Sequence, residues 1–298
     1  MSSRVAELLL VLFYVLAGEA GSVPQANQQR TSAGRGSVPL VRVLTAYQKG
    51  ESPEVRIVDG HDTTIEQHPW QVALLAAGVP DNRRAEFCGG SIIGDRWVLT
   101  AAHCVDEGTQ PGQVMILTDT ASLADRKRPI PLALQGIIVH GKWNSSTRDS
   151  DIALLHSAVD LGGKRISGWK NPEEPNLGGE ITITGWGAQA WHQSSRTKTL
   201  KEAKVKYVPR EVCNQRISYN GKITETMFCA GDKNGGADSC QGDSGGPATI
   251  EGAIGRELLV GVVSWGDECG VPNKYGVYTR ISQFADWVAE KTSGEVRW

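Results

Sequence analysis

The chain is predicted to fold as an all-β protein, and two observations lead to this prediction. From Ile57 onward, short runs rich in β-branched and aromatic residues alternate with Gly, Pro, Asn and Asp. Many short strands with closely spaced turns are typical of barrels and sandwiches. The 298 residues, 40% of them hydrophobic and 21% charged, are also enough to bury a full core.

Ten runs have the character of strands, and one segment near the C-terminus has that of a helix. The predicted strands are, in chain order, Gln71–Leu75, Ser91–Ile93, Trp97–Thr100, Val114–Leu117, Ile137–His140, Ile152–Leu155, Ile181–Thr184, Ala203–Val208, Leu258–Val263 and Val277–Thr279. Ser282 is placed to cap a final helix with Phe284, Trp287, Val288 and Lys291 on one face.

Residues 1–20 are predicted to be a secretory signal peptide. Arg4 precedes an apolar run from Leu8 to Ala17, and Gly18 to Ala20 offers small residues for cleavage. The run is short for a membrane span, although an uncleaved anchor is the alternative interpretation. The prediction is therefore a secreted, extracellular protein, or a periplasmic one if the source is bacterial.

Residues 21–56 are predicted to be a flexible propeptide that precedes the body of the protein at residues 57–298. They are rich in Gly, Ser, Pro, Gln and Arg, and they show no sustained period of 2 or 3.6 residues. Basic residues outnumber acidic ones in this segment, whereas acidic residues outnumber basic ones in the body. This charge difference indicates weak docking of the propeptide on the body.

Charge and cysteine content narrow the classes of partner and site. The formal net charge of −2 and the pI near 6.3 leave no broad basic field, which argues against nucleic acid and anionic membranes as partners. Six cysteines in an exported chain predict three disulfides rather than a metal site, because no pair has Cys-x-x-Cys spacing. Six cysteines allow 15 connectivities. We expect a monomer.

The segment Asp238–Pro247 has the character of a catalytic site. Ser244 is a candidate nucleophile among Gly242, Gly245 and Gly246, which lack a Cβ and let a substrate carbonyl approach the backbone. A serine needs a base to accept its proton and a third group to orient that base. All six histidines precede Ser244, which excludes the α/β-hydrolase order, in which the histidine follows the serine.

His103 and Asp151 are the candidates for the base and the orienting acid. His103 follows an apolar run and lies beside Cys104, which could hold it in place. Asp151 leads an apolar run, where a carboxylate can be buried and still accept a hydrogen bond from an imidazole. Each motif alone is more often structural. The three together, in this order, indicate nucleophilic catalysis.

From Ile57 to the C-terminus, the chain resembles the trypsin-like serine proteases of the chymotrypsin family. The matching motifs are Ile57-Val58 after Arg56, Thr100-Ala-Ala-His-Cys104, Asp151-Ile-Ala-Leu154, Gly185-Trp-Gly187, Gly242-Asp-Ser-Gly-Gly-Pro247 and Ser264-Trp-Gly266. The resemblance implies two six-stranded antiparallel β-barrels with a C-terminal helix. It also implies a Ser244, His103 and Asp151 triad, with an oxyanion hole at the Gly242 and Ser244 N–H groups.

The resemblance further implies cleavage after Arg or Lys in protein or peptide substrates, with protein protease inhibitors as further partners. Asp238 would lie at the base of the specificity pocket, where a substrate cation neutralises it, with Ser239 beside it. Gly266 and Gly276 would keep the pocket walls open. The backbone from Ser264 through Trp265 to Gly266 would pair with the substrate as an added strand.

Disulfide pairing and activation are also implied by the resemblance. The pairs would be Cys88 with Cys104, Cys213 with Cys229, and Cys240 with Cys269. Cleavage between Arg56 and Ile57 would free an Ile57 ammonium to pair with Asp243 and complete the site. No cysteine remains to tether the propeptide, so the cut is expected to release it. Because the activation bond follows an arginine, self-activation is a hypothesis.

Several positions depart from the family pattern. Asp59 stands where glycine is usual, and Tyr275 replaces a common proline. Glu268 at the pocket entrance could attract basic residues or narrow the mouth. Arg148 lies on a loop that in the family borders the outer subsites, and there it either favours acidic or small neighbours of the cleaved residue or has no effect. Asn144 begins a glycosylation sequon.

No metal or other cofactor is predicted, and two alternative functions remain. The loop that binds calcium in some relatives lacks a pair of acids here, since Asp119 is followed by the basic run Arg126-Lys-Arg128. One alternative is a catalytically inactive binding protein of the same fold, which the intact triad disfavours. The other is a chymotrypsin-like or elastase-like specificity, which Asp238 disfavours.

Overall fold

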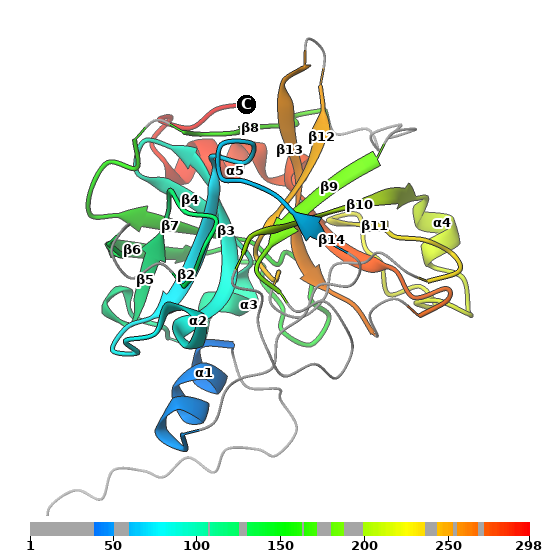
Figure 1. Ribbon diagram of the computed structural model, residues 1–298. Coiled ribbons are helices and arrows are strands. Elements are labelled where there is room, and N and C mark those ends of the chain that lie inside the picture. Colours follow the sequence, from blue (N-terminus) through cyan, green and yellow to red (C-terminus); the bar gives the residue numbers. More distant parts are fainter. Residues whose placement is uncertain are drawn as a thin grey trace, which may run out of the picture. The chain divides into compact units, whose positions relative to one another are not determined.

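A computed structural model describes most of the body of the protein and one segment before it (Figure 1). The described residues are 39–50, 60–106, 108–124, 130–162, 164–171, 180–187, 199–235, 243–252, 255–267 and 271–298. The predicted signal peptide lies outside them, as do Arg56, Ile57, Asp59, Arg126, Lys127 and Arg128.

Six strands of the first half of the body close into an antiparallel barrel in the order β2-β3-β4-β7-β6-β5. The strands are β2 (Gln71–Ala76), β3 (Glu86–Gly94), β4 (Trp97–Thr100), β5 (Val114–Leu117), β6 (Leu132–Val139) and β7 (Ala153–Ser157). Pairing of β2 with β5 closes the ring. Every residue of β2, β3 and β4 is buried, which explains their nearly continuous apolar runs.

Six strands of the second half form another closed antiparallel ring, β9-β10-β11-β14-β13-β12, with β12 returning to β9. They are β9 (Glu180–Gly185), β10 (Lys201–Val208), β11 (Met227–Ala230), β12 (Pro247–Glu251), β13 (Glu257–Trp265) and β14 (Gly276–Arg280). Two short strands join at the edges: β1 (His61–Asp62) pairs with β10, and β8 (Ser167–Gly168) pairs with β13 in parallel. The predicted double barrel is confirmed.

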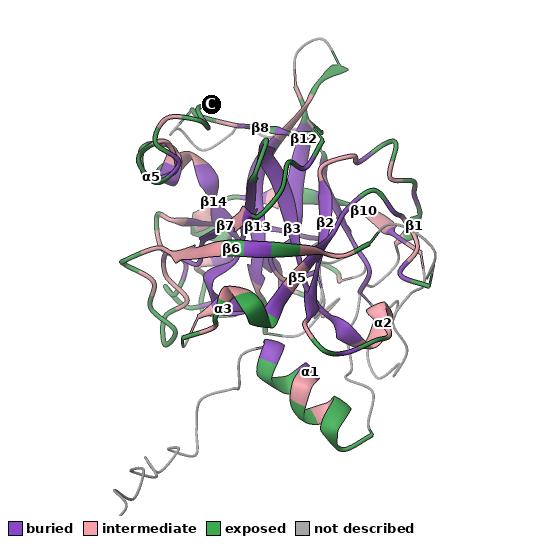
Figure 2. Ribbon diagram, turned by 90° about the vertical axis from the view of Figure 1, so that its left-hand side faces the viewer, coloured by how far each residue is buried: buried purple, intermediate pink, exposed green. Residues whose placement is uncertain are grey.

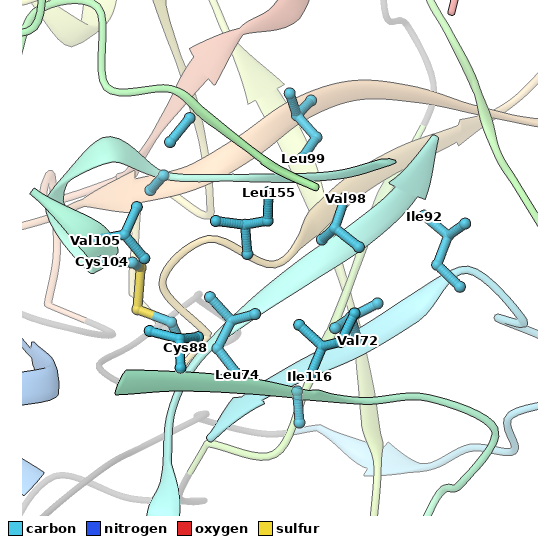
Figure 3. Packing of buried hydrophobic residues seen from close by; sticks show 14 of the residues in the cluster. Val72, Leu74, Cys88, Ile92, Val98, Leu99, Cys104, Val105, Ile116 and Leu155 are labelled. Atoms are coloured by element: carbon cyan, nitrogen blue, oxygen red, sulfur yellow. A yellow bond between two sulfur atoms is a disulfide. The ribbon is translucent and has the colours of Figure 1, made fainter. Parts of the chain in front are cut away.

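Each barrel has its own apolar core. In the first, the side chains of Val72, Leu74 and Ile116 meet those of Val98 and Leu155 inside the ring (Figure 3). In the second, the core contains Ile183, Phe228, Val260 and Tyr278, with the Phe228 and Tyr278 rings stacked at 5.1 Å. Inward side chains of opposite strands thus fill each barrel, as in other small barrels.

The strand predictions match some of the observed strands and miss others. Trp97–Thr100 and Val114–Leu117 have the bounds that the sequence predicts. The sequence missed β11 and β12. Strand β12 begins at Pro247, which lacks an N–H group for the ladder and is tolerated only at such a position.

The predicted C-terminal helix is present, but its cap is not the predicted one. A 3-10 turn, η3 (Ile281–Phe284), leads into α5 (Ala285–Lys291). Ser282 lies inside η3, and Phe284 is the N-cap of α5 with no side-chain cap hydrogen bond. Of the four residues predicted to share one face, Phe284 and Val288 are buried, Trp287 is half-buried and Lys291 is exposed. The chain turns directly out of β14, so packing of Phe284 rather than a cap positions this helix.

The remaining described helices are short, except one. They are α2 (Asn82–Ala85), α3 (Ala102–Val105), the 3-10 turn η1 (Pro111–Gln113) and α4 (Arg210–Cys213). The exception is α1 (Pro39–Gln48), which lies within the predicted propeptide. No helix in the described ranges is long and apolar enough to cross a membrane.

Helix α1 corrects the expectation of a propeptide without periodicity. Leu40, Val43, Leu44 and Tyr47 recur at the spacing of one helix face, and Pro39 occupies the first helical position, where its missing N–H group costs nothing. Leu40 and Val43 are buried, and Figure 2 shows both buried and exposed parts along the ribbon of α1. The composition of the whole segment concealed this short apolar stripe.

Candidate active site

His103 and Asp151 meet at one edge of the first barrel. Helix α3, which carries His103, begins two residues after β4 ends, and Asp151 lies two residues before β7 begins. Strands β4 and β7 are neighbours, with Thr100 opposite Ala153. Two hydrogen bonds join the pair: His103 Nδ1 lies 2.7 Å from Asp151 Oδ2, and the His103 N–H donates to Oδ1 over 2.9 Å. One carboxylate therefore orients both the ring and its backbone.

Asp151 also receives hydrogen bonds from the second barrel. Ser264 Oγ on β13 donates to Asp151 Oδ2 over 2.5 Å, and Thr279 Oγ1 on β14 donates to the Asp151 carbonyl over 2.7 Å. Asp151 is only 1% exposed. A buried carboxylate is costly unless donors surround it, and here three donors reach its two oxygens. The carboxylate is therefore held from both barrels.

The sequence missed the side-chain role of Ser264. The motif Ser264-Trp-Gly266 predicts a role only for the backbone of Ser264. In the structure, the β13–β14 register shifts between Val263 and Trp265, which are paired with Tyr278 and Val277. A β-bulge of this kind re-aims the side chain of the extra residue. The irregular register puts the Ser264 hydroxyl on Asp151, and no one-dimensional pattern announces such a shift.

Ser244 lies on a turn immediately before β12, held from both sides. Its carbonyl accepts a hydrogen bond from the Gly89 N–H over 2.8 Å, and the next residue, Gly245, donates to the Val263 carbonyl over 2.8 Å. Gly89 belongs to β3 of the first barrel and Val263 to β13 of the second. Ser244 is half-buried. Ser244 and His103 both lie in the part of the chain that the structure describes, and no hydrogen bond joins Ser244 Oγ to His103 Nε2 there.

Gly245 permits this turn for two reasons. Its φ is +80°, a conformation that costs a residue with a Cβ about 1–2 kcal/mol. A Cβ at this position would also lie 2.2 Å from Thr100 Oγ1, 2.6 Å from the Gly89 carbonyl and 3.2 Å from Cys104 Sγ. The turn that carries Ser244 thus packs directly on the end of β4 and on the sulfur of the residue that follows His103.

Two disulfides are described, and one of them supports the helix that carries His103. Cys88 on β3 is bonded to Cys104 in α3, as the resemblance implied, and Figure 3 shows this bond beside Val105. Cys213 in α4 is bonded to Cys229 on β11. The first bond ties the His103 helix to the strand that holds the Ser244 carbonyl.

Asp243 is buried next to the candidate nucleophile, and its carboxylate lies against the segment that follows β9. Its Oδ1 accepts a hydrogen bond from the Gly187 N–H at 3.3 Å. A Cβ on Gly185 would come within 2.1 Å of the same oxygen, so this close approach requires glycine. Ile57, the predicted partner of Asp243, lies outside the described residues.

Part of the predicted specificity pocket is described. Trp265 is half-buried with its ring edge-on to Tyr219 at 4.9 Å, and Tyr219 Oη donates to the Tyr275 carbonyl over 2.5 Å. Gly266, which follows Trp265 in the sequence, is exposed. Gly276, which follows Tyr275 and pairs with Ala230 of β11, is buried. Burial, followed by the charge of Asp232, raises the pKa of the Tyr275 hydroxyl. Asp238, Ser239, Cys240, Gly242, Glu268 and Cys269 lie outside the described residues.

The loop before Asp151 is fastened to the second barrel. Asp149 Oδ1 accepts hydrogen bonds from Thr224 Oγ1 and Thr226 Oγ1, each 2.6 Å long. Burial alone would raise the pKa of Asp149, but these two bonds and one from Ser150 lower it. Arg148 has a φ of +61°, and Asn144 is exposed. The backbone around Arg148 is therefore set by its neighbour's hydrogen bonds, whatever its side chain contributes to substrate binding.

One cluster has the spacing of a metal site but not its chemistry. Ligand atoms of Cys88, His103 and Cys104 lie within 4.8 Å of one another. The two sulfurs are bonded to each other, so neither is a thiolate that could bind a cation. The cluster is better explained as the support of His103.

Comparison with known proteins agrees with this geometry. The sequence profile of the trypsin family, described as "Trypsin", matches residues 57–288. The chain belongs to the trypsin family. As a trypsin-family protein, it is a serine endopeptidase, a hydrolase of peptide bonds.

Relatives in the trypsin family match most of the chain. It is 38% identical over 257 residues to trypsin of Phaedon cochleariae, covering 81% of this chain and 90% of that protein. It is 39% identical over 242 residues to trypsin Blo t 3 of Blomia tropicalis, covering 79% of this chain and 85% of that protein. It is 35% identical over 243 residues to transmembrane protease serine 11C of Mus musculus, covering 80% of this chain but 54% of that protein. The chain thus spans about half the length of the last relative.

Proposed function

We propose that this trypsin-family protein hydrolyses peptide bonds after Arg or Lys with Ser244 as nucleophile, His103 as general base and Asp151 as orienting carboxylate. The observation that carries the proposal is the hydrogen bond of 2.7 Å between His103 Nδ1 and Asp151 Oδ2, fixed by Ser264. With Nδ1 engaged by the carboxylate, Nε2 is the nitrogen left to accept a proton.

The chemical steps follow from this arrangement. Ser244 Oγ attacks the substrate carbonyl carbon while its proton passes to His103 Nε2. The N–H groups of Gly242 and Ser244 are proposed to bind the resulting oxyanion; removal of one such donor typically lowers kcat about 10²–10³-fold. His103 returns the proton to the leaving amine, and the acyl-enzyme is then hydrolysed by water, activated by the same imidazole.

Substrate choice and activation are part of the same proposal. Asp238, assisted by Ser239, selects a substrate Arg or Lys, while the backbone from Ser264 to Gly266 pairs with the substrate and Gly276 leaves room for its side chain.

The protein is secreted with residues 1–20 as signal peptide and 21–56 as propeptide. Hydrolysis of the Arg56–Ile57 bond creates the Ile57 ammonium, which pairs with buried Asp243 and completes the oxyanion hole. Protein protease inhibitors that present Arg or Lys are expected partners.

A substrate profile of the activated protein tests the proposal. The N-terminus of the active form should be Ile57 by sequencing, and peptide amides ending in Arg or Lys should be cleaved at least about 100-fold faster than those ending in Phe or Ala. Asp238→Ser should abolish that preference. Turnover that survives Ser244→Ala would contradict the nucleophile, and faster cleavage after Phe or Ala would contradict the specificity.

Self-activation is tested separately. The Ser244→Ala precursor, purified without any other protease, should remain uncut if the protein activates itself. Processing of this precursor at Ile57 would show that self-cleavage is not required.

A further inference from the structure

Helix α1 covers an apolar part of the first barrel's surface. It lies against α2, α3, β2 and β3 (Figure 1). Leu40 and Val43 are each 2% exposed and belong to the same apolar cluster as the barrel core, and Leu44 packs against it. Two aliphatic side chains of the predicted propeptide are therefore buried as deeply as residues of the protease body.

The contact is confined to one face of the helix. Val41, on the opposite side, is 49% exposed. At the C-terminal end, the Arg84 guanidinium of α2 lies 5.2 Å from the centre of the Tyr47 ring, a distance suited to a cation–π interaction. Apolar anchors at Leu40 and Val43 together with this cation–π pair fix both the face and the direction of the helix.

The contact is also independent of any covalent link. All six cysteines follow residue 57, so nothing but the backbone connects α1 to the body. The sequence therefore predicted release of the propeptide after activation. Burial of an amphipathic helix face in a complementary surface is, however, the way in which many helical peptides bind without a covalent tether.

We propose that the propeptide stays bound through α1 after the chain is cut between Arg56 and Ile57, so that the activated protein is a noncovalent two-chain complex. The cut adds one water across the peptide bond and leaves an Arg56 carboxylate and an Ile57 ammonium. The proposal rests on the proposed activation only for the position of this cut. In the complex, α1 continues to pack against α3, the helix that carries His103 and the sulfur of Cys104.

The test makes the cut with an external enzyme. In a full-length Ser244→Ala protein, residues 52–56 are replaced by the recognition sequence of an unrelated site-specific protease that cleaves directly before Ile57. After complete cleavage, size exclusion separates free fragment from body, and denaturing mass spectrometry identifies the chains in each peak. We expect the propeptide fragment and the body to co-elute in equal amounts. Elution of the fragment by itself would overturn the proposal.

Matched substitutions locate the contact. Leu40→Asp with Val43→Asp should free the fragment, because two carboxylates cannot be buried in an apolar surface. Val41→Asp adds a carboxylate to the same helix on its exposed side and should leave the complex intact. Retention of the fragment in the double variant, or its loss in both variants, would contradict docking through this face.

A competition experiment avoids any folding defect of the variants. A synthetic peptide of residues 37–50 should displace the fragment from the unsubstituted cut complex, with at least about tenfold more needed of the Leu40→Asp, Val43→Asp peptide. The Val41→Asp peptide should act within about threefold of the natural one. Equal potency of all three would refute the proposal. Because Ser244 is absent and the cut is external, neither experiment depends on activity, specificity or natural activation.

Discussion

At the scale of single residues, the carboxylate of Asp151 is hydrogen-bonded by side chains of both barrels. Its oxygens accept hydrogen bonds from His103 of the first barrel and Ser264 of the second. The position of the His103 ring therefore depends on the relative placement of β13 and α3. A hydroxyl of the second barrel thus contacts the carboxylate that orients a histidine of the first.

Replacement of Ser264 by alanine tests this dependence. Ser264→Ala removes a hydrogen bond to a buried carboxylate, an interaction worth about 1.5–3 kcal/mol, and we expect kcat to fall about 10–100-fold with KM changed less than about threefold. Steady-state kinetics on an Arg amide substrate would measure this. Ser157→Ala removes an equally buried hydroxyl on β7 that bonds Val159 N instead, and should leave kcat near that of the parent. Similar losses in both variants would contradict a positioning role for Ser264.

Gly245 is required for a different reason, because the turn on which it lies leaves no room for a side chain. Gly245→Ala combines a φ of +80° with a Cβ 2.2 Å from Thr100 Oγ1, so we expect the free energy of unfolding to fall by more than about 3 kcal/mol. Gly221→Ala has the same backbone cost, at φ +81°, with nothing within 4 Å of the Cβ, and should cost about 1–2 kcal/mol. Urea unfolding of both variants in the Ser244→Ala background measures the difference. Equal losses would mean that strain alone, and not crowding, explains the glycine.

At the scale of elements, α3 is too short to be stable alone. A four-residue helix is far below the length at which helices form unaided. It is held by β4 before it, by the Asp151 carboxylate on its His103 N–H and by the Cys88–Cys104 disulfide. The orientation of His103 is therefore supplied by surrounding elements rather than by the helix.

The two described disulfides give a matched pair for testing this. Each joins cysteines 16 residues apart, so the loop-entropy account predicts the same stability loss, about 3 kcal/mol, for Cys88→Ala with Cys104→Ala and for Cys213→Ala with Cys229→Ala. Only the first pair supports α3. Its loss should lower kcat at least about tenfold, measured well below the unfolding temperature, whereas the second should retain kcat within about threefold. Equal kcat losses would contradict the assignment of the Cys88–Cys104 bond to His103.

Prediction from sequence succeeded for elements in which burial produces a simple pattern. Strands such as Trp97–Thr100 are buried along their whole length and therefore read as unbroken apolar runs. It failed for α1, a ten-residue helix whose apolar stripe is embedded in a polar, Gly- and Ser-rich segment. Averaging composition over the whole segment hid a helix whose stability comes from docking on the body.

At the scale of the whole molecule, the residues of the candidate site could be predicted from chain order, but their supports could not. All six histidines precede Ser244, which excludes the α/β-hydrolase order, and Asp151 lies between His103 and Ser244 as in the family that the chain resembles. The hydroxyl of Ser264 reaches Asp151 from the residue of β13 at which the register with β14 shifts. Such contacts depend on how the second barrel is placed against the first, which no local sequence period encodes.

A second polar contact connects distant parts of the chain and makes stability depend on pH. Glu202 on β10 accepts hydrogen bonds from His68 Nε2 at 2.8 Å and from Thr63 Oγ1 at 3.2 Å. Both donors belong to the segment between the predicted activation site and the first barrel. Burial alone would raise the pKa of Glu202, but the His68 hydrogen bond and charge, with Thr63, lower it below the ordinary 4.5. The contact is therefore strongest when Glu202 is ionised.

The lowered pKa of Glu202 predicts that the folded protein loses stability in acid. The Glu202→Gln variant should lack this part of the pH dependence. Because the pKa of Glu202 is lower in the folded state, the unfolded chain binds more protons in acid; the stabilisation is complete above about pH 4.5 and is lost as the pH falls through the folded value. We expect Glu202→Gln to lower the free energy of unfolding by about 1 kcal/mol near neutral pH, with the two curves converging in acid. Urea unfolding of the Ser244→Ala protein across this range measures it. Glu225→Gln, at a side chain 85% exposed, serves as the control and should follow the parent at every pH. A Glu202→Gln curve parallel to that of the parent would mean that ionisation of this carboxylate does not stabilise the fold.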